Sequence, residues 1–166
     1  MEINIIAILI ASFVPLVLGF VWYHPNVFGE AWKNAAGVNV ERMAPGRMAL
    51  TFGLTFLLSF LIAFALQSLV IHQFHMASIL MNEPGLFDPS TEIGKFYKDF
   101  IAQHGNNFRT FKHGALHGTI AGFTIALPIL GINALFERKS FKYVAINAGY
   151  WIVLLCLMGG IICSMR

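Results

Sequence analysis

Four histidines are the side chains in this sequence whose spacing most suggests chemistry. His72 and His75 stand three residues apart, and His113 and His117 stand four apart. In a helix, these spacings place both members of a pair on one face. Imidazole is the commonest metal ligand, and helical bundles build metal sites from facing helices. The four histidines therefore predict a metal site, or a haem held by one histidine from each pair.

A second explanation of the histidines stays open on the sequence alone. Histidines at the edge of a membrane also bond to water, lipid headgroups or loop carbonyls, and no carboxylate completes a motif such as His-Glu-x-x-His. The intervening loop contains four further possible ligands, namely Asp88, Glu92, Asp99 and His104. The cofactor, if there is one, is therefore not identified.

Acid–base catalysis has little support in the sequence. His24 and Glu30 could exchange protons if they met, but nothing in their spacing brings them together. The chain has no Ser/His/Asp set, phosphate-binding loop or Cys-x-x-Cys motif. No catalytic residue is assigned, and a non-enzymatic protein is favoured.

The elements that carry the histidines belong to a strongly apolar chain. Of its 166 residues, 57% are hydrophobic and 11% are charged, whereas soluble domains have about a quarter charged residues. Four runs lack charge over more than the roughly 20 residues that a helix needs to cross a bilayer. The spans predicted from these runs are 3–23, 47–75, 113–136 and 141–165.

These spans predict an all-α integral membrane protein, an antiparallel four-helix bundle forming a single domain over residues 1–166. A different helix is expected at about 89–104, with Asp88 as its N-cap. Its apolar residues recur on one face, at Ile93, Phe96, Tyr97, Phe100 and Ile101. Such an amphipathic helix is expected to lie flat at the interface or to cap the bundle.

Aromatic and basic residues suggest how the chain sits in a cell membrane. Aromatic side chains with polar tips prefer the headgroup level; here these are Trp22, Tyr23, Phe28 and Trp32. Basic residues in short loops favour the cytoplasm. A small excess in the loops between spans one and two and spans three and four predicts that the termini and the 76–112 loop lie outside. The net charge of +3 is explained by the lysines and arginines of these loops. No binding to nucleic acid is therefore expected.

Small residues recur every four positions in the third span. They are Gly114, Gly118, Gly122 and Ala126. Small residues let two helix backbones approach closely, which matters in lipid because no hydrophobic force drives the helices together. The row predicts a tight contact, either with a neighbouring helix of the same chain or with a second copy.

The end of the first span resembles a known family. The stretch Gly19-Phe20-Val21-Trp22-Tyr23-His24-Pro25 leads into Phe28-Gly29-Glu30-Ala31-Trp32. This is similar to the opening motif of small membrane proteins catalogued as domain of unknown function 1761. Similar features follow later, in the glycine-rich third span, at 135–139 and at Asn147-Ala148-Gly149-Tyr150-Trp151. The 76–112 insert is longer than in such proteins. The resemblance implies four membrane helices and no particular activity.

Three functions are weighed from these features. The leading hypothesis is a non-enzymatic membrane subunit that self-associates or docks on a larger membrane assembly, motivated by the glycine row and the lack of charge within the spans. The alternative is a metal- or haem-binding membrane protein that uses the four histidines. A third hypothesis is an oligomeric channel or carrier for small solutes. The lipid bilayer and a second copy or membrane-protein partner are the expected contacts.

Overall fold

The computed structural model of the protein describes residues 3–38 and 45–165. Within this part of the chain, every regular element is a helix. In order these are α1 (Ile5–Trp22), η1 (Pro25–Gly29), α2 (Glu30–Ala36), α3 (Pro45–Val70), α4 (Gln73–Ile79), α5 (Glu92–His104), α6 (Phe111–Ala121), η2 (Gly122–Ala126), α7 (Leu127–Phe136) and α8 (Phe141–Ser164). The elements η1 and η2 are single π-helical turns.

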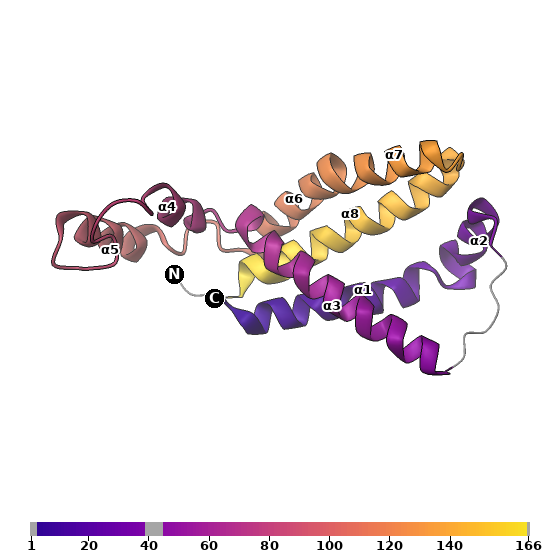
Figure 1. The fold of residues 1–166 in the computed structure, drawn as a ribbon, viewed down its shortest axis with the longest axis horizontal. Helices are drawn as coiled ribbons and strands as arrows, with labels where there is room; N and C mark the ends of the chain where they lie inside the picture. Colours follow the sequence, from indigo (N-terminus) through magenta and orange to yellow (C-terminus); the bar gives the residue numbers. More distant parts are fainter. Residues whose placement is uncertain (1–2, 39–44, 166) are drawn as a thin grey trace.

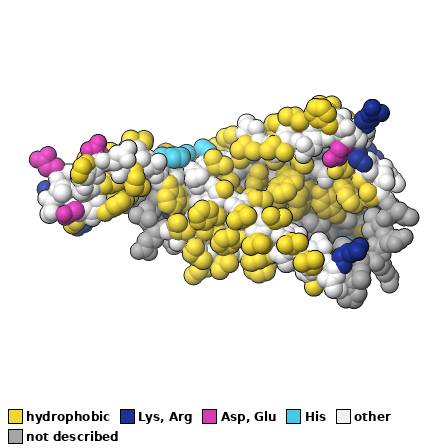
Figure 2. Space-filling model, viewed as in Figure 1, with side chains coloured by type: hydrophobic (Ala, Val, Ile, Leu, Met, Phe, Trp, Pro, Cys, Tyr) yellow, Lys and Arg dark blue, Asp and Glu magenta, His cyan; other side chains and the backbone are white. Residues whose placement is uncertain are grey.

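Four helices are long and apolar enough to span a membrane, as the charge-free runs predicted. They are Ile5–Trp22, Gly46–Val70, Phe111–Phe136 and Phe141–Ser164. The flank formed by these helices is mainly hydrophobic, while charged side chains gather towards the two ends of the long axis (Figure 2). Apolar side chains that water would expel therefore cover the outside of the molecule.

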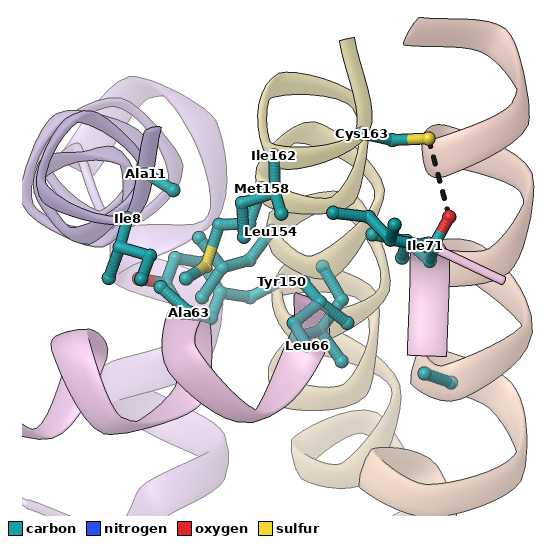
Figure 3. Close-up of a cluster of buried hydrophobic side chains, with 13 residues drawn as sticks. Ile8, Ala11, Ala63, Leu66, Ile71, Tyr150, Leu154, Met158, Ile162 and Cys163 are labelled. Atoms are coloured by element: carbon teal, nitrogen blue, oxygen red, sulfur yellow. Dashed lines mark hydrogen bonds between the residues drawn. The ribbon is translucent and has the colours of Figure 1, made fainter. Parts of the chain in front are cut away.

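The last helix, α8, is the centre of the packing. It contacts α1, α3, α6 and α7. The third span, α6 to α7, runs alongside α8, and α1 crosses α3 on the other side (Figure 1). Fully buried side chains fill the space between these helices, including Ile8 of α1 and Leu154, Met158 and Ile162 of α8 (Figure 3). In lipid, such close packing supplies most of the attraction between helices.

The second span ends at Val70, earlier than the predicted 75. The last α-helical bond joins the Ile71 amide to the Gln67 carbonyl at 2.9 Å, and the Phe74 amide then donates only three residues back, to Ile71 at 3.3 Å. The Val70 carbonyl accepts instead from the Cys163 thiol of α8, at 3.3 Å (Figure 3). This tertiary bond replaces a helical one, so the chain bends at residues 71–72 and continues as α4.

Replacing Cys163 by alanine is expected to destabilise this bend. The thiol also lies 3.4 Å from the Phe108 carbonyl. Its single hydrogen can be donated to either carbonyl, and its loss leaves both without this donor. A buried carbonyl without a partner costs about 1–3 kcal/mol. Thermal unfolding in detergent measures the effect. Cys156→Ala, at a partly exposed site of the same helix, is the control, and equal shifts for both variants would contradict the expectation.

The third span is continuous but contains the π-helical turn η2. Pro128 has no amide hydrogen, and its ring would clash with the carbonyl of Thr124 in a regular α-helix. The turn before it is widened, so that the Leu127 amide donates to the Gly122 carbonyl five residues back. The widened turn thus accommodates the proline without ending the span.

The segment from α4 to α5 forms a lobe beyond the ends of the long helices (Figure 1). The Gln73 amide group holds it together by donating to the Asn107 carbonyl at 2.7 Å and to the His104 carbonyl at 3.3 Å. Phe87 packs edge-on against Tyr97 of α5, with ring centroids 5.9 Å apart. The lobe therefore has contacts of its own, independent of the spans.

The helix expected at 89–104, α5, begins later, at Glu92, because Thr91 and not Asp88 is its N-cap. The Thr91 hydroxyl accepts from the Gly94 amide at 3.0 Å. Asp88 instead closes a preceding turn, accepting from the Ser90 amide and hydroxyl at 2.9 and 2.7 Å. These hydrogen bonds hold the pKa of Asp88 below its usual value. Asp88 and Thr91 are both good capping residues, and the tight 88–91 turn decides between them.

Candidate metal centre at the junction of α3, α4 and α6

Three of the four predicted histidines converge at one point. His72 lies in the bend between α3 and α4, and His113 and His117 lie one turn apart on α6. The ring centroid of His72 is 4.8 Å from that of His113 and 4.7 Å from that of His117, and the two α6 rings are 4.5 Å apart. One ligand nitrogen from each ring lies within 4.8 Å of the other two.

The position of the α6 histidines is set by the start of their helix. The Thr110 hydroxyl caps α6 by accepting from the His113 amide at 3.3 Å. This cap fixes Phe111 as the first helical residue, and hence the face on which His113 and His117 stand. Both imidazoles are half-buried. Their arrangement therefore follows from local sequence and does not need a bound ligand to be explained.

One nitrogen of His113 is buried without a hydrogen-bond partner. Within the described residues, His113 Nε2 and the Tyr97 hydroxyl are the buried side-chain polar atoms in this state. A buried polar atom with no partner costs about 1–3 kcal/mol. A cation between the three rings would supply His113 Nε2 with the partner it lacks.

The surroundings of His72 affect its protonation. Partial burial, followed by the neighbouring imidazoles of His117 and His75, lowers the pKa of His72. A lowered pKa keeps a histidine neutral at physiological pH, and only the neutral ring has a lone pair to give to a metal.

His75 and the acidic residues of the lobe lie outside this group. The His75 ring is exposed and its centroid is 6.3 Å from that of His72. Within the described chain, the histidines, cysteines and carboxylates that could jointly hold an ion are His72, His113 and His117. His104 packs against the Phe100 ring at 4.9 Å instead.

The separations suit a small ion after a minor adjustment. Zinc bonds to imidazole nitrogen at about 2.0–2.1 Å, so tetrahedral ligands stand about 3.4 Å apart. The observed limit of 4.8 Å can close by rotation of the side chains, since the terminal torsion of histidine is broad. A haem would need two imidazoles on opposite sides of a flat ring, which three mutually adjacent rings do not offer.

A cavity of about 390 Å³ adjoins His72 on the lobe side. It is lined by His72, Gln73, Met76, Phe100, His104, Asn107 and Phe108. The site is therefore accessible from the polar end of the molecule, so an ion would not have to cross the apolar flank.

The glycine row lies against α8 of the same chain. A Cβ atom on Gly114 would collide with the Gly159 carbonyl, and one on Gly118 with the Leu155 carbonyl. A Cβ on Gly122 would stand 2.7 Å from the Cα of Ile152. Ala126 packs at the margin of the buried cluster. Of the two partners that the sequence allowed, the row faces the neighbouring helix.

Two of the four aromatics that were expected at the membrane interface, Trp22 and Tyr23, join the end of α1 to α8. Trp22 Nε1 donates to the Ile146 carbonyl at 3.2 Å, and the Tyr23 hydroxyl donates to Asn147 Oδ1 at 3.0 Å. Phe28 packs on Trp22 at 4.7 Å, and Trp32 packs on Tyr23 at 5.4 Å. The sequence analysis missed these contacts with α8. The available signal was that both partners belong to the stretches resembling the family.

His24 and Glu30 are engaged separately. His24 Nδ1 accepts from the Asn26 amide at 3.2 Å, and Glu30 lies 4.0 Å from the Lys33 ammonium. His24 and Glu30 thus have separate partners close to them in the sequence, and the structure gives no support for acid–base work by this pair.

Comparison with known proteins identifies the family of the chain but no individual relative. No curated protein and no solved structure matches the chain. The family described as "Protein of unknown function (DUF1761)" matches residues 6–163. This range covers the four long helices except for Ile5 and Ser164, and it contains the lobe and the three converging histidines. The chain therefore belongs to the DUF1761 family, as the motifs at the end of the first span and in the fourth had indicated.

Proposed function

We propose that this protein is a multi-pass membrane protein that binds a divalent d-block cation such as Zn²⁺ through His72, His113 and His117. The observation that carries the proposal is the convergence of three ligand nitrogens within 4.8 Å of one another. Imidazole suits zinc, copper, nickel and iron, while magnesium and calcium prefer oxygen. His75 lies outside the converging group and is not one of the proposed ligands.

The proposed setting is a bilayer crossed by the four long helices as an antiparallel bundle. The apolar flank and charged ends support this setting (Figure 2), because charged side chains are costly within the hydrocarbon. The histidines then lie at one edge of the bilayer, and the α4–α5 lobe covers that edge. Lys33, Arg138, Lys139 and Lys142 lie at the opposite end, and basic short loops favour the cytoplasm. The lobe would then face outward.

Metal content of the purified protein tests the proposal. The wild type in mild detergent is expected to hold about one zinc per chain after incubation and desalting, since three imidazoles and a water form a complete zinc shell. His113→Ala and His117→Ala are each expected to lose it. His75→Ala is the matched control, because His75 lies outside the converging group, and it is expected to keep the metal.

Two outcomes would reject a specific site. If the wild type holds no more zinc than His113→Ala, the three histidines are ordinary interfacial residues. If His75→Ala loses zinc as fully as His117→Ala does, binding reflects a loose collection of imidazoles. A Soret band that is lost when His72 is replaced would show that the protein binds a haem and not a metal ion.

The hypothesis of a self-associating subunit loses its first motivation. The small residues of α6 are already in contact with α8, so a second copy would need another surface. Self-association and docking on a larger assembly, as well as solute transport by an oligomer, stay hypotheses that the histidine site does not require.

A further inference from the structure

An apolar groove opens on the flank of the molecule between α3 and the η2–α7 segment. Its volume is about 360 Å³, within the range of roughly 300–1,000 Å³ typical of small-molecule sites. Every lining residue is apolar, and Trp151 and Leu155 of α8 contribute to the lining. In the proposed bilayer setting this flank faces the hydrocarbon, so an apolar chain and not water would fill the groove.

One wall of the groove leads towards the three histidines. The α3 wall, with Ala65 and Leu69, ends with the helix at Val70, and His72 lies in the bend that follows. On α6, His117 is followed four residues later by the lining residue Ala121. Residues three and four apart share a helix face, and four residues rise only about 6 Å. His117 therefore continues the α6 wall of the groove, and it lies in the converging group with His72 and His113.

A continuous surface of this kind matches one class of ligand. It offers an apolar channel at hydrocarbon depth and, one helical turn away, a metal site at headgroup depth. A three-histidine zinc site leaves a fourth position, and a carboxylate oxygen is a ligand that zinc accepts at about 2.0–2.2 Å. An amphiphile with one long hydrocarbon tail and an anionic oxygen headgroup has both halves in the right order.

We propose that the metal centre and the groove together form a binding site for a long-chain carboxylate, with its headgroup on the metal and its tail between α3 and α7. This inference rests on the proposed metal function and names its ligand. A helix from a second copy could fill the groove but would bring no anionic group to the metal unless it carried an acidic side chain at that depth.

Quenching of Trp151 fluorescence measures entry into the groove. The probe is stearic acid with a doxyl group at the middle of its chain, added to the zinc-loaded protein in detergent, and the Trp151→Phe variant gives the background from Trp22 and Trp32. We expect saturable quenching of Trp151, with at least about tenfold weaker affinity after zinc is removed. The methyl ester of the probe, which has no anionic headgroup, is expected to bind as weakly as the acid does without zinc.

Two variants of α3 distinguish loss of lipid binding in the groove from loss of the metal. Ala65→Phe fills the groove from an exposed position and is expected to abolish quenching while leaving zinc content unchanged. Ala49→Phe, at an exposed position of the same helix that does not line the groove, is expected to quench like the wild type. Zinc content, measured on every sample, shows whether the metal site itself has failed.

Three results would overturn the lipid proposal. Equal quenching by the acid and its ester in zinc-loaded protein would show that the groove is ordinary lipid-facing surface. No quenching in protein that does hold zinc would leave the metal function standing without this ligand. Loss of quenching with a disulfide between two Ala65→Cys chains would show that a second copy occupies the groove.

Discussion

Gly118→Ala is expected to abolish most of the folded protein. The added Cβ would collide with the Leu155 carbonyl and stand 3.1 Å from the Cys156 amide nitrogen. Both are backbone atoms of α8, so no side chain can turn away to make room. Overpacking of a well-filled interior costs about 1–3 kcal/mol and sometimes more, and here a helix of the core would have to move. The expected loss is about 3 kcal/mol or more.

The control lies on the same span. A Cβ on Gly131 meets nothing within 4 Å, so Gly131→Ala removes backbone freedom without a clash and is expected to be neutral or slightly stabilising. The yield of monodisperse protein on size exclusion in mild detergent, together with its melting temperature, compares the two. If Gly118→Ala behaved like Gly131→Ala, the close approach of α6 to α8 would be disproved.

Zinc is expected to stabilise the folded protein, and His117→Ala is expected to remove this stabilisation. The metal would join the α3–α4 bend to the first turns of α6, two segments that separate when the protein unfolds. A ligand that binds only the folded state adds about 2.7 kcal/mol at one hundred times its dissociation constant. Melting temperature is measured with added zinc, after chelation and with magnesium.

The shift of the melting temperature with zinc is compared between the wild type and three histidine variants. The wild type and His75→Ala are expected to gain stability with zinc and to lose it on chelation. His72→Ala and His117→Ala are expected to melt at the same temperature with or without the metal. Magnesium, which prefers oxygen ligands, is expected to have no effect on any of them. A zinc shift that survives in His117→Ala would place the metal elsewhere.

The four long helices could be predicted because charge is excluded from lipid. Runs without Lys, Arg, Asp or Glu mark the spans regardless of how these pack, and the observed helices fall within a few residues of the expected ones. The family could also be predicted, because its motifs are contiguous in the sequence. Both conclusions rest on local features.

Features that depend on contacts between distant segments could not be predicted. The end of α3 at Val70 is fixed by the Cys163 thiol, a partner 93 residues later in the chain. A proline such as Pro128 disfavours a regular α-helix, but nothing in the sequence shows that the helix widens at Gly122 instead of kinking. For α5, the choice of Thr91 over Asp88 as N-cap depends on a turn whose geometry propensities do not determine.

The candidate site was predicted in part for the same reason. The sequence grouped four histidines by helical spacing, on the assumption that α3 continued to residue 75. The bend at 71–72 breaks that helix, so the three-residue spacing of His72 and His75 does not bring both rings to the same point. Only in the α6 pair do both rings lie on one helix face as predicted, because α6 is a regular helix from its cap at Thr110 onwards.

The bonds between the end of α1 and the start of α8 have a consequence for the order of assembly. Tyr23 and its acceptor Asn147 are 124 residues apart. A ribosome adding about 5–20 residues per second needs about 6–25 s to synthesise that interval. During that time Trp22 and Tyr23 have no partner on α8, because this helix does not yet exist. The bonds between the first and last helices can therefore form only after almost the whole chain has been synthesised.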